Sequence, residues 1–168
     1  TSLILPNALT YIGEGAFSDC QGLTGSLNIP ENVTYIGDSA FSHTCFTGSL
    51  YLPNNLKYMG DWAFLGCHGF TGSLTIPEKI TKIGAGTFDS CYGFNGYLHL
   101  PQNLTHIGGR AFSGCNYRGE LKLPDNLLSS GEVAFQGTGF LGVLKLPSSL
   151  ISKRSLPLFS LLPDPLIP

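Results

Sequence analysis

The chain has 168 residues, of which 42% are hydrophobic and 12% are charged, and this balance excludes a disordered, strongly charged segment. Nine Lys and Arg against eleven Asp and Glu give a net charge of -2, so no basic cluster is present and a nucleic-acid partner is not expected. No run reaches the roughly 18 apolar residues of a spanning helix, and the start has no charged leader, so neither membrane insertion nor a signal peptide is expected in this segment.

Prolines recur through the chain at steps of 23 or 24 residues. They are Pro6, Pro30, Pro53, Pro77, Pro101, Pro124 and Pro147. Glycine and phenylalanine follow the same step. Their positions are Gly13, Gly37, Gly60, Gly84, Gly108 and Gly131, with Phe17, Phe41, Phe64, Phe88, Phe112 and Phe135. A period of this length indicates a stacked solenoid, because a single unit cannot bury its own apolar face.

Each unit begins with an alternating segment, as in Leu27-Asn28-Ile29, which predicts a short strand ended by the proline that follows. Val33 and Ile36 then point inward. Gly37 is expected at a corner that needs a positive φ, and the next four residues suit a short turn, 3₁₀ or helical piece on the other face. The sequence predicts a repeat solenoid with one short parallel strand per coil of 23 or 24 residues.

The core is predicted from three apolar columns. They are Leu27, Leu50, Leu74, Leu98, Leu121 and Leu144; Ile29, Leu52, Ile76, Leu100, Leu123 and Leu146; and Val33, Leu56, Ile80, Leu104, Leu127 and Leu150. A fourth column of Ile and Met ends at Ser130.

The segment from Ile29 to Phe41 reads I-P-E-N-V-T-Y-I-G-D-S-A-F. It resembles the BspA-like, or Treponema pallidum type, leucine-rich repeat, and the likeness extends over residues 3–150. The resemblance implies a curved right-handed solenoid of surface or secreted proteins that often act as adhesins, and it brings no catalytic residues with it.

We expect residues 1–150 to form about six coils and residues 151–168 to form a degenerate last repeat or a C-terminal cap. In this last part Phe159 still meets the phenylalanine column, whereas Arg154 stands where a core isoleucine is expected. Because the first coil begins at a strand, the chain is expected to be a fragment of a larger protein.

Four of the five cysteines, Cys20, Cys67, Cys91 and Cys115, share one repeat position, which predicts a column of small buried thiols. Bridges between coils are possible but not favoured, because stacked side chains point the same way. Without a C-x-x-C pair or a histidine column, no metal site and no cofactor is expected. The neighbours Cys67 and His68 suggest a thiol and its base, but no third orienting group is evident, so the chain is not expected to be an enzyme.

Two other motifs have structural explanations. Gly13-Glu14-Gly15 begins like a phosphate-binding loop, but its first glycine belongs to the corner column and the downstream glycine is missing. Asn32-Val33-Thr34 and Asn103-Leu104-Thr105 match the glycosylation sequon and equally fit the turn of the repeat.

A partner is expected where outward columns vary while the scaffold columns stay constant. The outward strand column and its flank supply the predicted ligand-binding residues, which are Asn28, Tyr51, Thr75, Tyr97, His99, Glu120 and Lys122. Aromatic side chains with polar tips are enriched at protein interfaces. A second candidate face carries Tyr11, Tyr35, Tyr58, Lys82 and His106, and the sequence does not rank the two.

The leading hypothesis is a surface-exposed or secreted module that binds another protein, for example a host or extracellular-matrix protein. One alternative is a structural spacer or stalk of a larger surface protein, which predicts no ligand. Another is a carbohydrate-binding module that holds a glycan through Tyr51 and Tyr97.

Overall fold

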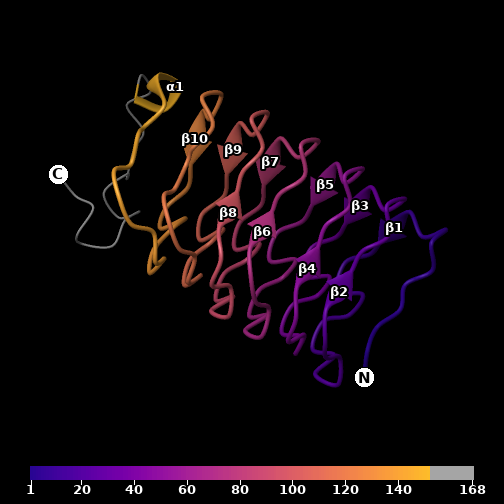
Figure 1. The fold of residues 1–168 in the computed structure, drawn as a ribbon. Coiled ribbons are helices and arrows are strands. Elements are labelled where there is room, and N and C mark those ends of the chain that lie inside the picture. Colours follow the sequence, from indigo (N-terminus) through magenta and orange to yellow (C-terminus); the bar gives the residue numbers. More distant parts are fainter. Residues whose placement is uncertain (152–168) are drawn as a thin grey trace.

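The computed structural model describes residues 1–151 as a stack of coils, each a flattened loop wound about a common axis (Figure 1). One row of strands consists of β2 (Leu27–Asn28), β4 (Leu50–Tyr51), β6 (Leu74–Thr75) and β8 (Leu98–His99). The other row consists of β1 (Tyr11–Ile12), β3 (Tyr35–Ile36), β5 (Tyr58–Met59), β7 (Lys82–Ile83), β9 (His106–Ile107) and β10 (Ser129–Ser130). The short helix α1 (Ser148–Ile151) follows the last strand.

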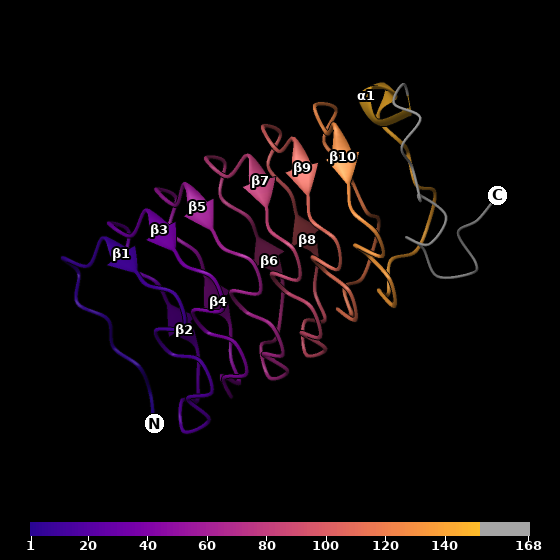
Figure 2. The ribbon, with the colours of Figure 1, turned by 180° about the vertical axis from the view of Figure 1, so that it is seen from behind.

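The two rows lie on opposite sides of the solenoid. The row from β2 to β8 is the nearer one in Figure 1, and the row from β1 to β10 is the nearer one in Figure 2. Within both rows all pairings are parallel, as stacked coils require. The predicted solenoid is therefore confirmed, and four of the described coils carry two short strands, one more than the sequence had indicated.

The second strand arises from the same alternation of side chains as the first. Tyr35 points outward and Ile36 is fully buried, and the pair repeats in register as Tyr11–Ile12 and Tyr58–Met59. Two residues of alternating polarity are enough for a rung of parallel sheet once neighbouring coils fix the backbone.

A third ladder of hydrogen bonds joins the turns that follow the corner glycines. At each of five junctions three amide N–H groups donate to carbonyls of the next coil, as Ser39 does to Asp61 (2.9 Å), Phe41 to Ala63 (2.8 Å) and His43 to Leu65 (2.7 Å). The first and third donors are left-handed, with φ of 53° at Ser39 and 56° at His43. Alternating right- and left-handed residues turn successive N–H groups to one side, which explains this ladder.

The core lies between the two rows and the turns. Leu27, Val33 and Ile36 are fully buried, as are their equivalents in most coils. Among the predicted core positions, Leu146 is exposed, and four others are only partly buried, namely Leu52, Leu100, Leu123 and Leu144. Phenylalanines of consecutive coils stack in a continuous column, as Phe41 does on Phe64 with ring centroids 5.3 Å apart.

The expectation that Gly37 turns the chain with a positive φ is wrong. The structure gives this residue an ordinary φ and places it against the preceding coil, where an added Cβ would lie 2.5 Å from the backbone nitrogen of Glu14. Gly108 repeats this contact, at 2.5 Å from the nitrogen of Ala85. The glycine column therefore exists because adjacent backbones pass too close for a side chain.

The segment from residue 152 to 168, for which a degenerate repeat or cap is expected, lies outside the described residues.

Candidate functional site

The row of strands from β2 to β8 presents the predicted binding residues to solvent. We call this surface the β2–β8 face. Its outward residues are Asn28, Tyr51, Thr75, His99, Lys122 and Lys145, flanked by Ser26, Ser49, Ser73, Tyr97, Glu120 and Val143. All seven residues predicted from the sequence are exposed, because strand alternation turns each away from a buried neighbour.

Backbone pairing on the β2–β8 face is interrupted at regular places. β2 pairs with β4 and β6 pairs with β8, but the two pairs belong to separate sheets. Leu27 N–H donates to the Ser49 carbonyl and Leu74 N–H donates to that of Tyr97, whereas the described residues show no such bond from Leu50. Strands β4 and β6 therefore meet at an open junction.

Each open junction coincides with a groove. The groove between β4 and β6 has a volume of about 410 Å³. Tyr51 and Thr75 line its two sides, with Ser49, Asn54 and Ser73 at its edges. It offers one aromatic ring and a set of neutral hydrogen-bonding groups.

The next groove lies between β8 and the following coil and has a volume of about 530 Å³. Tyr97, His99, Glu120 and Lys122 line it. The Tyr97 ring lies close to Gly119, whose added Cβ would be 2.8 Å from Tyr97 Cε1, and Tyr97 is 59% exposed. Its centroid is 6.4 Å from that of His99, with the rings tilted by 47°.

A third groove, of about 470 Å³, follows beside the bridge between Lys122 and Lys145. Together with Glu120 and Asp125, these lysines make the C-terminal part of the β2–β8 face the charged part.

The structure thus brings four of the seven predicted residues around one groove and two around another, while Asn28 lies apart from both. Asn54 and Gln102 line these grooves but were absent from the sequence prediction. Coil length does not indicate which junctions open, because the 24-residue step from Leu50 to Leu74 is open and the equal step from Leu74 to Leu98 is paired.

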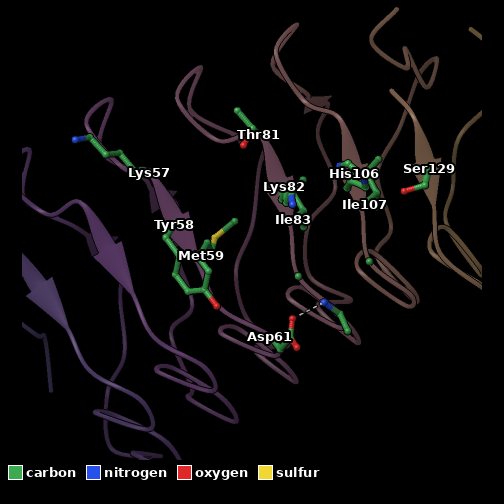
Figure 3. A pocket seen from close by; sticks show the side chains of 13 residues that line it. Lys57, Tyr58, Met59, Asp61, Thr81, Lys82, Ile83, His106, Ile107 and Ser129 are labelled. Atoms are coloured by element: carbon green, nitrogen blue, oxygen red, sulfur yellow. Dashed lines mark hydrogen bonds between the residues drawn. The ribbon is translucent and has the colours of Figure 1, made fainter. Parts of the chain in front are cut away.

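The opposite surface, which we call the β1–β10 face, carries a stack of three tyrosines. The ring centroids of Tyr11 and Tyr35 are 4.7 Å apart, and those of Tyr35 and Tyr58 are 4.6 Å apart, with planes within 12°. Burial raises the pKa of Tyr58 above its ordinary value, and the nearby carboxylate of Asp38 adds to the effect. A groove of about 470 Å³ lies beyond Tyr58. Figure 3 shows Lys82 and His106 among the side chains that line it.

The cysteine column is a structural element. Cys67, Cys91 and Cys115 are buried, and each thiol donates to a phenylalanine carbonyl of the preceding coil at 3.1 Å. Cys20, predicted to belong to this column, is exposed instead. Burial raises the pKa of Cys67 to about 11, so this thiol stays protonated at neutral pH.

His68 contacts the following coil through both its ring nitrogen and its ring face. The Nδ1 of His68 bonds to the Ser90 carbonyl at 2.7 Å while its ring stacks on Tyr92. No group of three or more His, Cys, Asp or Glu side chains in residues 1–151 is arranged to hold a metal ion. No helix of the same range is long and apolar enough to cross a membrane.

The sequon asparagines take part in a ladder of their own. The side-chain amide of Asn32 donates to the Asn7 carbonyl at 2.8 Å, and that of Asn103 donates to the Glu78 carbonyl at 3.5 Å. Asn55 and Asn126 repeat the bond in coils that have no sequon. The bond explains the asparagines at this turn without any glycosylation.

The repeat itself decides the family. The sequence matches six copies of the BspA type leucine rich repeat region, over residues 1–96 and 95–159. The chain belongs to the BspA-type leucine-rich repeat family. As a BspA-type chain it uses the Ile-Gly and Ala-Phe positions of each repeat for the contacts between coils described above.

Solved structures of bacterial leucine-rich repeat proteins share the BspA-type fold. A protein of Bacteroides ovatus has 26% sequence identity and a TM-score of 0.73 over 86% of this chain and 37% of its own. A leucine-rich cell surface protein of Faecalibacterium prausnitzii has 27% identity and a TM-score of 0.67, over 83% of this chain and 39% of its own. A T. pallidum leucine-rich repeat protein, at 21% identity, shows the same fold with a TM-score of 0.61 over 89% of this chain and 79% of its own.

The BspA-type chain described here spans less than half the length of the Bacteroides and Faecalibacterium proteins. No curated protein matches the sequence.

Proposed function

We propose that this chain is a surface-exposed or secreted protein-binding module, adhesin-like and without catalytic activity, whose partner contacts the β2–β8 face. The observation that carries the proposal is the groove lined by Tyr97, His99, Glu120 and Lys122, where an aromatic face and charges of both signs are exposed together.

This composition suits a protein partner. Tyrosine provides a large, rigid contact area with a hydroxyl that can bond at the edge, and such residues are enriched among those that dominate binding energy. Glu120 and Lys122 point from the same short segment and can orient a partner that carries complementary charges.

The scaffold beneath this face supports recognition by exposed side chains. The buried columns and the continuous ladder of the turns fix the coils, so that residues between them vary without loss of the fold. The cell-surface designation of the Faecalibacterium protein supports the same location for this chain, where a host or extracellular-matrix protein is the expected partner.

Two other functions remain as outcomes of the test. A spacer or stalk predicts no specific ligand on either face. A carbohydrate-binding module is favoured by the exposed ring of Tyr97, on which a sugar can stack.

The test is binding of the full chain to immobilised extracellular-matrix proteins, host receptors and glycans, compared with a variant that combines Tyr51→Ala, Tyr97→Ala and His99→Ala. We expect a protein ligand that the wild type binds and the variant does not. Thermal unfolding of both proteins checks that the fold is unchanged.

Tyr11→Ala is the matched control, because Tyr11 is as exposed as Tyr51 but lies on the opposite face. Retained binding by this control together with loss in the triple variant supports the proposal. Binding that survives the triple substitution rejects the β2–β8 face, a glycan as the ligand supports the carbohydrate function, and binding to no member of the panel supports the spacer.

A further inference from the structure

We infer that the groove beyond Tyr58 on the β1–β10 face is a second binding site, and that it takes an aromatic side chain with an adjacent carboxylate from a peptide segment of a partner protein. The site lies on the side opposite to the β2–β8 face, so it goes beyond the function proposed above and does not depend on it.

The stack of tyrosines ends at this groove. Tyr35 covers one face of the Tyr58 ring at a centroid distance of 4.6 Å, and Tyr58 lines the groove with its other side. The ring is 45% exposed, which leaves that second face available. Offset stacking on an exposed aromatic face is a favourable way to hold another ring.

The register of the strands leaves a place for one further ring. Tyr11, Tyr35 and Tyr58 occupy successive rungs, and the next two rungs hold Lys82 and His106, which are directly paired. Figure 3 shows Tyr58, Lys82 and His106 following one another across β5, β7 and β9. A ring at the level of Lys82 would lie between Tyr58 and His106, where it can stack on Tyr58 and reach His106.

Small residues make up part of the lining of the groove. Gly84, Ala85 and Gly108 are among them, whereas the two preceding coils carry Asp38 and Asp61 at the position of Ala85. β5 and β7 also belong to separate sheets, so the junction under the groove is open. A volume of about 470 Å³ is ample for one aromatic side chain and its backbone.

The charges in the groove favour an acidic ligand. Lys82 is exposed and has no ion pair among the described residues, so its flexible chain can move aside and place its ammonium beside a carboxylate. The one carboxylate that lines the groove, Asp61, is already engaged, because its Oδ1 accepts the Ala85 N–H at 2.8 Å. The dashed line in Figure 3 marks this bond.

The experiment uses the full chain and a blocked pentapeptide with a central phenylalanine between pairs of glutamates. Binding is followed through the fluorescence of Trp62, the only tryptophan of the chain, which directly follows Asp61, and through NMR shifts of the tyrosine rings. A peptide with central alanine and one with lysines in place of the glutamates serve as ligand controls.

We expect saturable binding of the phenylalanine peptide at up to millimolar concentration and about three- to tenfold weaker binding by Tyr58→Ala. Lys82→Tyr should extend the stack, fill the vacant rung and weaken binding at least about tenfold, since it removes both the space and the cation. Tyr51→Ala, on the opposite face, should bind the peptide as the wild type does.

Absence of binding, equal binding of the alanine or lysine peptide, or undiminished binding by Tyr58→Ala would overturn the inference. Circular dichroism of each variant separates a lost site from a lost fold. Because Tyr51→Ala affects only the β2–β8 face, a failure here leaves the proposed function standing, and the reverse also holds.

Discussion

Phe64 stacks on Phe88 of the next coil with ring centroids 5.3 Å apart and planes within 1° of each other. Both rings are fully buried, and each also meets a ring of a second aromatic column edge-on, as Phe64 does with Phe70 at 6.3 Å. This double column joins every coil to its neighbours, so a ring removed from the middle affects two interfaces at once.

Replacement of Phe64 by alanine should therefore lower the free energy of unfolding by about 3 to 5 kcal/mol, because the cavity cannot close between two stacked rings. Urea unfolding monitored by circular dichroism measures the change.

Tyr51→Ala is the control for that experiment, since Tyr51 is exposed and should cost less than about 0.5 kcal/mol. Equal losses for the two variants would show that scaffold and surface columns are wrongly assigned.

The corner glycines predict a second effect on stability. Gly108→Ala should cost about 3 kcal/mol, because its Cβ would meet backbone atoms of Gly84 and Ala85 that cannot move independently. Gly15→Ala should cost only about 1 kcal/mol, since Gly15 has a φ of 59° but open space around it. Unfolding curves of the two variants test the order, and a larger loss for Gly15→Ala would contradict the close-approach explanation.

Tyr117 is a tyrosine in the second aromatic column, where its ring stacks between those of Phe94 and Phe140. It is fully buried, and its hydroxyl has no hydrogen-bond partner among the described residues beyond the weakly bonding thiol of Cys115 beside it. Tyr117→Phe should raise the free energy of unfolding by about 1 kcal/mol, because it removes a buried polar group that lacks a good partner. A decrease of similar size in the free energy of unfolding would show instead that this hydroxyl makes a hydrogen bond in the folded chain.

Thiol chemistry should divide the five cysteines into two groups. Cys20 and Cys45 are exposed, and Cys67, Cys91 and Cys115 are buried. Titration of the folded chain with a thiol reagent at neutral pH should modify two cysteines rapidly and the other three only after unfolding. Mass spectrometry identifies the modified positions, and early reaction of Cys91 would refute the buried column.

The buried thiols also predict an alkaline loss of stability. Burial raises the pKa of Cys67 from an ordinary 9.0 to about 11 and that of Cys115 to about 12. Between pH 9.0 and the raised pKa of each thiol, the unfolded chain has released a thiol proton that the folded chain keeps. The free energy of unfolding therefore falls as pH rises above 9. The slope should reach about 1.4 kcal/mol per pH unit for each thiol.

Urea unfolding at pH 8 and pH 10, repeated with Cys115→Ala, measures this contribution. The variant should show the smaller decrease between the two pH values, and an unchanged decrease would assign the alkaline loss to other groups.

The fold could be predicted from the sequence because each repeat carries the same residue types at the same positions. Leu27, Ile36 and Phe41 are buried as their spacing predicts, and Asn28 and Tyr35 alternate outward. The family was evident from the same residues. The predicted positive φ of Gly37 is wrong, because a local sequence pattern does not distinguish a positive φ from a close approach between two backbone segments about 24 residues apart.

The grooves were beyond sequence reasoning for a related reason. β4 and β6 are unpaired although the same 24-residue step separates the paired strands β6 and β8, so the repeat pattern does not indicate which strands pair. The outward column could be predicted as exposed, but its division into one groove at Tyr51 and another at Tyr97 required the structure. Cys20 matches its column in sequence, yet its burial depends on contacts that its spacing does not specify.

Covalent footprinting of tyrosines in the presence of a bound partner tests the β2–β8 face most directly. Four tyrosines are almost equally exposed, with Tyr51 and Tyr97 at 59%, Tyr11 at 56% and Tyr92 at 55%, so the free chain should be labelled similarly at all four. We predict that the partner protects Tyr51 and Tyr97 and leaves Tyr11 and Tyr92 reactive. Protection of Tyr11 or Tyr92, with Tyr51 and Tyr97 still labelled, would contradict the account.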